Sequence, residues 1–185
     1  MKKIIVLLCA ILLCGLSANA QNLLSYKDSL KIYEGTWKYE NPTTKEIFII
    51  KLKEFTDRQD NDVIYSFYGT YSYSKGGVEI TNTHNVSLPL KYLNSYTDVP
   101  LSQLSNVPIW IDCWYAKKSG LYFMDKKYNK NEGGGYVQLL STKAGDEKLL
   151  WYPQNGEGVR VYVTGEPEEP EGFSVPVNVV MTKVH

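Results

Sequence analysis

Hydrophobic and polar side chains alternate with a period of two over most of this chain. Between residues 46 and 55, for example, Phe48, Ile50 and Leu52 fall on one face, and Lys51 lies on the other. This alternation is typical of a β-strand that has one buried and one solvent-exposed side. The pattern therefore predicts a chain built mainly of strands.

The same alternation, interrupted by turns rich in Gly, Pro and Asn, predicts roughly ten short strands. They cover residues 35–40, 46–55, 63–74, 78–88, 109–115, 121–127, 136–140, 149–152, 159–164 and 175–184. Many short strands separated by turns indicate an all-β sandwich or barrel.

Three short motifs and one long segment are expected to connect these strands. Residues 75–77, Lys-Gly-Gly, predict a tight hairpin. Residues 118–120, Lys-Ser-Gly, are expected to form a second turn, and the three glycines at 133–135 a flexible hairpin tip. Residues 89–108 contain three prolines, and an irregular stretch of this length often serves as a lid or rim.

One segment has helical rather than strand spacing. Leu23, Tyr26, Leu30 and Tyr33 recur at intervals of three and four residues, as on one face of a helix. We expect a short N-terminal helix over residues 23–34.

The first twenty residues have the three parts of a secretory signal peptide. Lys2 and Lys3 form the basic region, residues 4–13 the apolar core, and residues 18–20, Ala-Asn-Ala, the cleavage site. The apolar run is shorter than the roughly twenty residues that cross a bilayer. We therefore expect a signal peptide over residues 1–20 and no membrane span.

Cleavage after Ala20 leaves residues 21–185 as a single exported domain, periplasmic or secreted. Lipoprotein anchoring at Cys14 is disfavoured, because Leu13 stands where a small residue is needed. Cys113 is the only cysteine that remains, so no intramolecular disulfide is expected.

The charge balance gives no sign of a nucleic-acid partner. Without Lys2 and Lys3 the chain carries 18 basic and 20 acidic residues. Nucleic-acid binding proteins usually show an excess of basic residues. We expect neither a nucleic-acid partner nor binding to an anionic membrane surface.

The triplet Gly35-Thr36-Trp37 after the predicted helix resembles the first motif of the lipocalin and calycin barrels. In that family the tryptophan plugs one end of the barrel, and a basic residue late in the chain covers it. The resemblance implies an antiparallel up-and-down, lipocalin-like β-barrel of roughly 8–10 strands, with Trp37 as a structural plug. Lys183 and Arg160 are the two candidates for the basic residue.

Four segments resemble a family of small exported bacterial domains of unknown function. They are Gly-Thr-Trp-Lys-Tyr at 35–39, Tyr-Gly-Thr-Tyr-Ser-Tyr at 68–73, Ile-Thr-Asn-Thr at 80–83, and the closing Phe-Ser-Val-Pro at 173–176 with Thr-Lys-Val at 182–184. This resemblance supports the fold and implies no activity.

The chain is also similar to avidin-like barrels, which combine Gly-Thr-Trp, Gly-Thr-Tyr and a terminal Thr-Lys-Val. Tyr71 corresponds to a tyrosine that binds the ureido group of biotin in that family. Tyr39 and Thr43 stand near positions where the family has Asn and Ser, and Tyr73 replaces a second Ser. Burying a ureido group without its partners is costly, so biotin is disfavoured.

No motif in the sequence specifies a reaction. A nucleophile needs an adjacent base, and the histidines are His84, in phase with the predicted strand 78–88, and the terminal His185. Cys113 alternates with isoleucines, which suits a buried apolar role. The sequence does not place a carboxylate pair of the glycosidase type around Asp112. We expect no enzyme activity, no catalytic residues, no metal and no cofactor.

Binding is the remaining class of function, and it has two forms. In the first, the barrel carries a small, mostly apolar ligand; the candidate contacts are Tyr71, Tyr73, Asn82, His84, Trp110 and Asp112. In the second, the barrel is solid, and the protein is an envelope or secreted interaction module whose outer surface binds protein or glycan. The ordinary alternative for the aromatic residues is packing of the β core.

Overall fold

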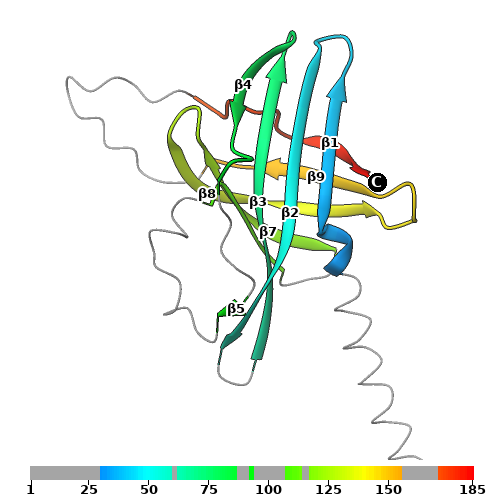
Figure 1. Ribbon diagram of the computed structural model, residues 1–185, viewed down its shortest axis with the longest axis vertical. Coiled ribbons are helices and arrows are strands. Elements are labelled where there is room, and N and C mark those ends of the chain that lie inside the picture. The colour runs from blue at the N-terminus through cyan, green and yellow to red at the C-terminus, as the bar shows by residue number, and fades with distance from the viewer. Residues whose placement is uncertain (1–29, 60–61, 87–91, 94–106, 114–116, 156–170) are drawn as a thin grey trace, which may run out of the picture. The chain divides into compact units, whose positions relative to one another are not determined.

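The computed structural model describes residues 30–59, 62–86, 92–93, 107–113, 117–155 and 171–185 (Figure 1). The chain divides into two compact units, residues 1–32 and 33–185, and the second contains every described strand. The predicted signal peptide over residues 1–20 lies outside the described residues.

The N-terminal helix is described only at its end. Residues 23–29 of the predicted helix lie outside the described residues, and the first described element is a 3-10 turn, η1 (Lys31–Tyr33). Gly35 has a φ of 121°, a backbone conformation that only glycine adopts easily. This glycine lets the chain turn directly from η1 into the first strand.

The structure contains ten strands among its described residues. They are β1 (Gly35–Asn41), β2 (Glu46–Gln59), β3 (Asp62–Lys75), β4 (Val78–Asn82), β5 (Tyr92–Leu93), β6 (Ile109–Asp112), β7 (Lys118–Asp125), β8 (Lys130–Ser141), β9 (Lys148–Pro153) and β10 (Val179–Val184).

Eight of these strands form a closed antiparallel barrel. The ring runs β3-β6-β7-β8-β9-β10-β1-β2, and pairing of β2 with β3 closes it. Strand β4 pairs with the last residues of β3, and β5 pairs in parallel with β2. The predicted all-β antiparallel barrel is confirmed.

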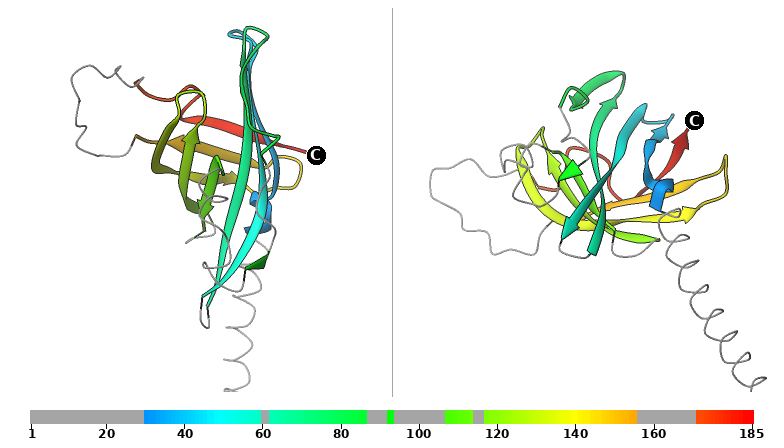
Figure 2. Two further views of the ribbon diagram at one scale, coloured as in Figure 1. Left: turned by 60° about the vertical axis from the view of Figure 1, so that its left-hand side comes forward. Right: turned by 60° about the horizontal axis from the view of Figure 1, so that its bottom comes forward.

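The strands of unit 33–185 cross in two directions. In Figure 1, β1, β2, β3 and β4 run nearly vertically, and β8 and β9 cross behind them. Figure 2 shows the same arrangement from two other sides. The crossing brings the inner faces of both groups of strands together in one core.

The inner face of the barrel is packed with apolar and aromatic side chains. Because side chains alternate between the two faces of a strand, every second residue of each strand points inward. The buried inward set is Trp37, Phe48, Ile50, Leu52, Phe67, Tyr71, Tyr73, Ile109, Ile111, Leu121, Phe123, Val137, Leu139, Leu149, Trp151 and Met181.

The predicted hairpin at residues 75–77 is confirmed, but its second strand is shorter than predicted. Lys75 pairs with Val78, and Gly76 and Gly77 both have positive φ. Strand β4 ends at Asn82 rather than at residue 88. Directly after β4, the Thr83 hydroxyl donates to the carbonyl of Tyr71 and accepts from its N–H. A side chain thus takes the place of the regular strand-to-strand backbone pairing.

The prediction of a turn at residues 118–120 is wrong. These residues begin β7, and Ser119 is buried on its inner face. A Ser-Gly pair favours a turn, but here Gly120 pairs with Asp112 within the sheet. Predicted strand 159–164 lies outside the described residues.

The three glycines at 133–135 lie inside β8 and not at a hairpin tip. The turn between β7 and β8 is formed by residues 126–129 instead. The pairing of β7 with β8 shifts between Gly120 and Tyr122, where β8 carries an extra residue. Such a bulge needs unusual backbone angles, and Gly135 supplies one with a φ of 105°.

Substitution of Gly135 tests this bulge. A Cβ at Gly135 would lie 2.2 Å from the carbonyl oxygen of Tyr152, whereas a Cβ at Gly145, with a φ of 80°, would meet nothing within 4 Å. We expect Gly145→Ala to cost roughly 1–2 kcal/mol from backbone strain alone. Gly135→Ala should cost roughly a further 1–3 kcal/mol from the clash. Urea denaturation measures both, and equal losses would contradict the bulge.

Candidate functional site

The barrel interior has two chemically different ends. Ser119 and Asp125 both point inward from β7, and six residues of strand separate them by about 20 Å. Ser119 contacts Tyr33 and Asp125 contacts Ser174. We call these the Tyr33 end and the Asp125 end.

Packed side chains fill the Tyr33 end. The indole N–H of Trp37 donates to the carbonyl of Tyr33 at 2.8 Å. The Tyr33 ring lies 5.7 Å from that of Phe67, and its hydroxyl accepts from Ser119 at 3.5 Å. Tyr33, Trp37 and Phe67 have no exposed surface.

Lys183 covers Trp37. The two residues pair across β1 and β10, and the Lys183 ammonium lies 5.4 Å from the Trp37 ring centre, within the range of a cation–π contact. A Cβ at Gly35 would come within 3.1 Å of the Lys183 side chain, so the glycine makes room for it. Burial lowers the pKa of Lys183. Arg160, the other candidate, lies outside the described residues.

Four rings from four strands meet in the interior and form what we call the aromatic cluster: Phe48, Tyr71, Phe123 and Trp151. Phe48 lies 6.2 Å from Tyr71 and 5.5 Å from Trp151, and Phe123 lies 5.1 Å and 5.3 Å from the same two rings. All four are fully buried. The cluster joins β2, β3, β7 and β9 across the barrel.

Trp151 brings an unsatisfied donor into this cluster. Its indole N–H is buried and has no hydrogen-bond partner among the described residues. Leaving such a donor unpaired costs roughly 1–3 kcal/mol, and buried indole N–H groups usually have a partner. The site therefore provides a donor for which the described part of the protein supplies no acceptor.

Tyr71 points toward the Asp125 end. Its hydroxyl accepts from the backbone N–H of Lys126 at 2.8 Å and lies 3.4 Å from the Met124 carbonyl. Burial is the main cause that raises its pKa. Tyr71 therefore stays neutral at physiological pH and ties β3 to the turn after β7.

Asp125 holds the C-terminal segment against the barrel. Its carboxylate is fully buried and accepts from the N–H groups of Lys127 and Tyr128 and from both the N–H and the hydroxyl of Ser174. The neighbouring Phe173 places its ring 5.7 Å from Phe123. Asp125 thus anchors Phe173 beside the aromatic cluster.

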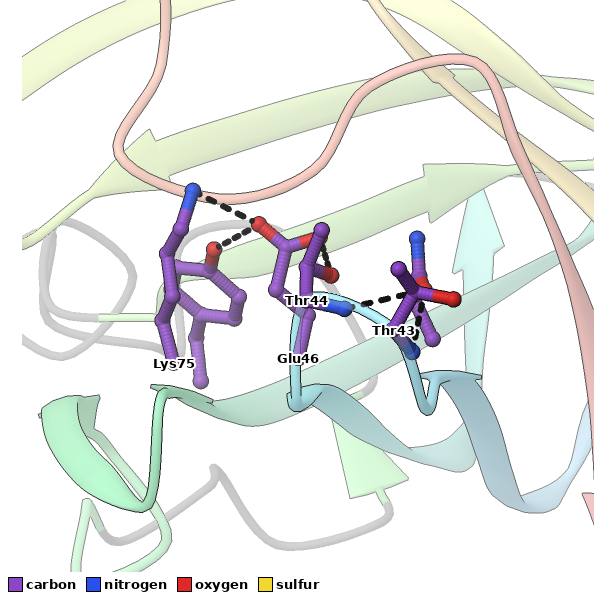
Figure 3. A network of polar contacts seen from close by, with 6 residues as sticks. Thr43, Thr44, Glu46 and Lys75 are labelled. Carbon is purple, nitrogen blue, oxygen red and sulfur yellow. Dashed lines mark hydrogen bonds and ion pairs between the residues drawn. The ribbon is translucent and has the colours of Figure 1, made fainter.

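A second polar group lies where β2 begins and β3 ends. Glu46 accepts from the Tyr73 hydroxyl at 2.9 Å and from Thr44 at 2.8 Å, and it pairs with Lys75 at 3.0 Å (Figure 3). The hydrogen bond from Lys75 is the largest cause of the lowered pKa of Glu46. The pKa of Tyr73 is raised, mainly by burial and next by its hydrogen bond to Glu46.

Asn41 fixes the turn between β1 and β2, because its side chain accepts from the Thr43 and Thr44 N–H groups.

Trp110 and Asp112 lie on the face of β6 opposite to the buried Ile109 and Ile111. They therefore do not line the interior. The Trp110 ring lies 5.4 Å from Tyr68, in a separate apolar cluster with Phe55 and Val107. Asp112 accepts from Ser66 at 3.1 Å, and burial raises its pKa.

Asn82 and His84 also lie away from the aromatic cluster. His84 is in a turn after β4 and not on a strand, and its Nδ1 lies 2.9 Å from the Thr70 hydroxyl. Burial and the charge of Lys51 lower the pKa of His84. Asn82 is exposed and donates to Glu79. Of the six predicted contacts, only Tyr71 and Tyr73 lie on the inner face of the barrel.

Sequence reasoning missed Glu46, Asp125 and Trp151. Trp151 was visible as an aromatic residue in a predicted strand, but its register against other strands was not. Asp125 was placed in a strand, where an inward-facing carboxylate is unusual. A charged residue at an inward position of the alternation was the signal that could have pointed to Asp125.

The thiol of Cys113 is buried. Burial raises the pKa of the Cys113 thiol to about 12, so it is protonated at physiological pH. Among the residues that the structure describes, no group of three His, Cys, Asp or Glu side chains is placed to hold a metal ion. No described helix combines the length and apolarity that crossing a bilayer requires.

The sequence matches a family of unknown function, DUF6705, over residues 1–184. The chain belongs to the DUF6705 family. This confirms the expectation of a family of unknown function, and the structure gives this member an eight-stranded barrel fold. Neither curated proteins nor solved structures provide a match.

The Tyr33 end predicts a large effect of truncating Trp37. Trp37→Ala removes a fully buried ring together with its hydrogen bond to Tyr33. We expect a loss of roughly 3–5 kcal/mol in the free energy of unfolding, measured by urea denaturation. Tyr122→Ala, which truncates an exposed ring, is the control. A loss below about 1 kcal/mol for Trp37→Ala would refute its placement as a plug.

Glu46 predicts a specific acid sensitivity. Its folded-state pKa lies below the ordinary 4.5, so its contribution is complete above about pH 4.5 and is lost as the pH falls through the lower folded value. Glu46→Gln should be less stable than the wild type at pH 7, and this difference should shrink in acid. Glu40→Gln, which changes an exposed carboxylate nearby, is the matched control. A difference that stays constant with pH would exclude this role of Glu46.

Proposed function

We propose that this protein is an exported, non-catalytic barrel that binds one small, mostly apolar molecule at the Asp125 end. The observation that carries the proposal is the buried Trp151 N–H without a partner among the described residues. A ligand oxygen that accepts from it would remove the cost of the unpaired donor. The aromatic cluster would pack against the apolar body of the same molecule.

The difference between the two ends supports this location. Tyr33, Trp37 and Lys183 fill one end. The other end combines apolar rings with a few polar groups, as small-molecule sites usually do. A barrel of eight strands is just wide enough to hold side chains or one small ligand.

The titratable groups support binding rather than catalysis. Raised pKa values keep Tyr71, Tyr73 and Cys113 protonated, so none is poised as a base or nucleophile at neutral pH. A lowered pKa keeps His84 neutral, and it lies on the outside of β3 beside Thr70. Export is supported by the signal-peptide pattern of residues 1–20.

A second candidate function is recognition of a protein or glycan by the outer surface. The rings of Tyr136 and Tyr152 stack at 4.9 Å, and Lys118 lies over Tyr136 at 3.8 Å. Tyr122, on the adjacent strand, is 53% exposed. Tyrosine is among the side chains that are enriched in binding surfaces.

Native mass spectrometry distinguishes the two functions. Protein purified gently from cells that export it should carry one reproducible added mass, which is lost on denaturation. That mass would also give the size of the ligand. A sample that always shows the bare chain mass would contradict the carrier and favour the outer surface.

The role of Trp151 has its own test. Trp151→Phe keeps an aromatic ring and removes the N–H, so ligand affinity should fall about five- to tenfold, the value of one hydrogen bond of roughly 1–1.4 kcal/mol. The matched control is Trp110→Phe, on the outside of β6. Titration of the extracted ligand measures both, and equal affinities for the wild type and Trp151→Phe would exclude this contact.

A further inference from the structure

The segment before β10 is attached to the barrel in an unusual way. Residues 171–178, which we call the strap, precede the first strand pairing of β10 at Val179. Two bonds from Ser174 to Asp125 and the ring contact of Phe173 with Phe123 hold it at the Asp125 end. The strap therefore lies against the barrel by side-chain contacts rather than by a strand ladder.

The strap carries a backbone feature of a hinge at each end. Gly172 has a φ of 72° and Asn178 a φ of 55°. Glycine and asparagine are the residues that adopt this left-handed conformation most readily. Hinges concentrate large backbone changes in a few residues at the ends of elements, and Gly172 and Asn178 stand at such positions.

Phe173 occupies the place next to the aromatic cluster. Its ring contacts Phe123, and Phe123 contacts Trp151 at 5.3 Å. Phe173 is only half-buried, unlike the cluster rings. Because packed aromatic rings already fill the described interior, an incoming molecule needs a group that moves aside. Phe173 belongs to the strap and not to a barrel strand.

We propose that the strap is a lid and that Phe173 stands in for the ligand when the site is empty. This inference rests on the proposed function. The ligand class is a molecule with an aromatic or similarly flat apolar body that packs on Phe123 in place of Phe173. One oxygen of that molecule accepts from the Trp151 N–H.

Asp125 acts as the latch of this lid. Lys127 and Tyr128 donate to its carboxylate from the turn after β7, and these bonds do not depend on the strap. Of the four bonds that Asp125 accepts, the two from Ser174 break when the strap leaves. Asp125 thus keeps two hydrogen bonds in the open state, so opening does not leave its buried carboxylate without partners.

The test uses residues 21–185 and the probe 1-anilinonaphthalene-8-sulfonate, which has flat apolar rings and sulfonate oxygens. Fluorescence titration and stopped-flow mixing compare the wild type with Phe173→Ala. We expect Phe173→Ala to bind about five- to tenfold more tightly, because the probe no longer competes with a ring. Val177→Ala, which alters a 47% exposed residue of the same strap, should match the wild type.

Ser174→Ala provides a second variant that removes a single hydroxyl. It should leave the fold intact and raise the association rate several-fold, because the latch is weaker. It also keeps the test decisive if Phe173→Ala does not fold. Near-ultraviolet circular dichroism confirms native packing in each variant.

The possible outcomes separate the lid from the carrier. Wild-type binding with unchanged or weaker binding by Phe173→Ala, and an unchanged rate for Ser174→Ala, would overturn the lid and leave the carrier standing. No binding of the probe by any variant, together with a bare chain mass in native mass spectrometry, would overturn the carrier itself. Tighter binding by Phe173→Ala that Trp151→Phe then weakens supports both.

Discussion

The pairing of β2 with β3 is the constraint on which the rest of the barrel depends. The two strands pair over 14 residues each and close the ring. Pairing in one register places Phe48, Ile50 and Leu52 inward together with Tyr71 and Tyr73. A slip by one residue would turn the inward side chains of one of the two strands outward. The aromatic cluster therefore exists because this long hairpin has a fixed register.

The closed barrel has two ends, and they differ in the residues that cover them. Trp37 and Tyr33, with Lys183 over the indole ring, close one end by side chains that are buried and paired. At the other end, Asp125 holds a segment that belongs to no strand. We therefore expect local opening at the strap, as in proteins whose binding segments come from the least stable parts.

Alternation along the chain was sufficient to predict most strands and the barrel class, because one face of each strand is buried. It failed where a local preference was overridden by distant partners. Glycines that favour a turn lie in β8, because the backbone of β9 approaches Gly135 too closely for any side chain. The sequence analysis named Tyr71 and Tyr73 as candidate contacts but did not name Trp151, because which rings meet depends on strand register and crossing angle.

Amide hydrogen exchange across residues 21–185 tests the central claim most directly, namely that one end of the barrel is fixed and the other opens. We predict that the N–H of Ser174 exchanges through a low-energy local opening, whereas those of Trp37 and Tyr71 exchange only with global unfolding. Added ligand or probe should change exchange at the strap alone. Equal protection of Ser174 and the β2–β3 hairpin would contradict the account.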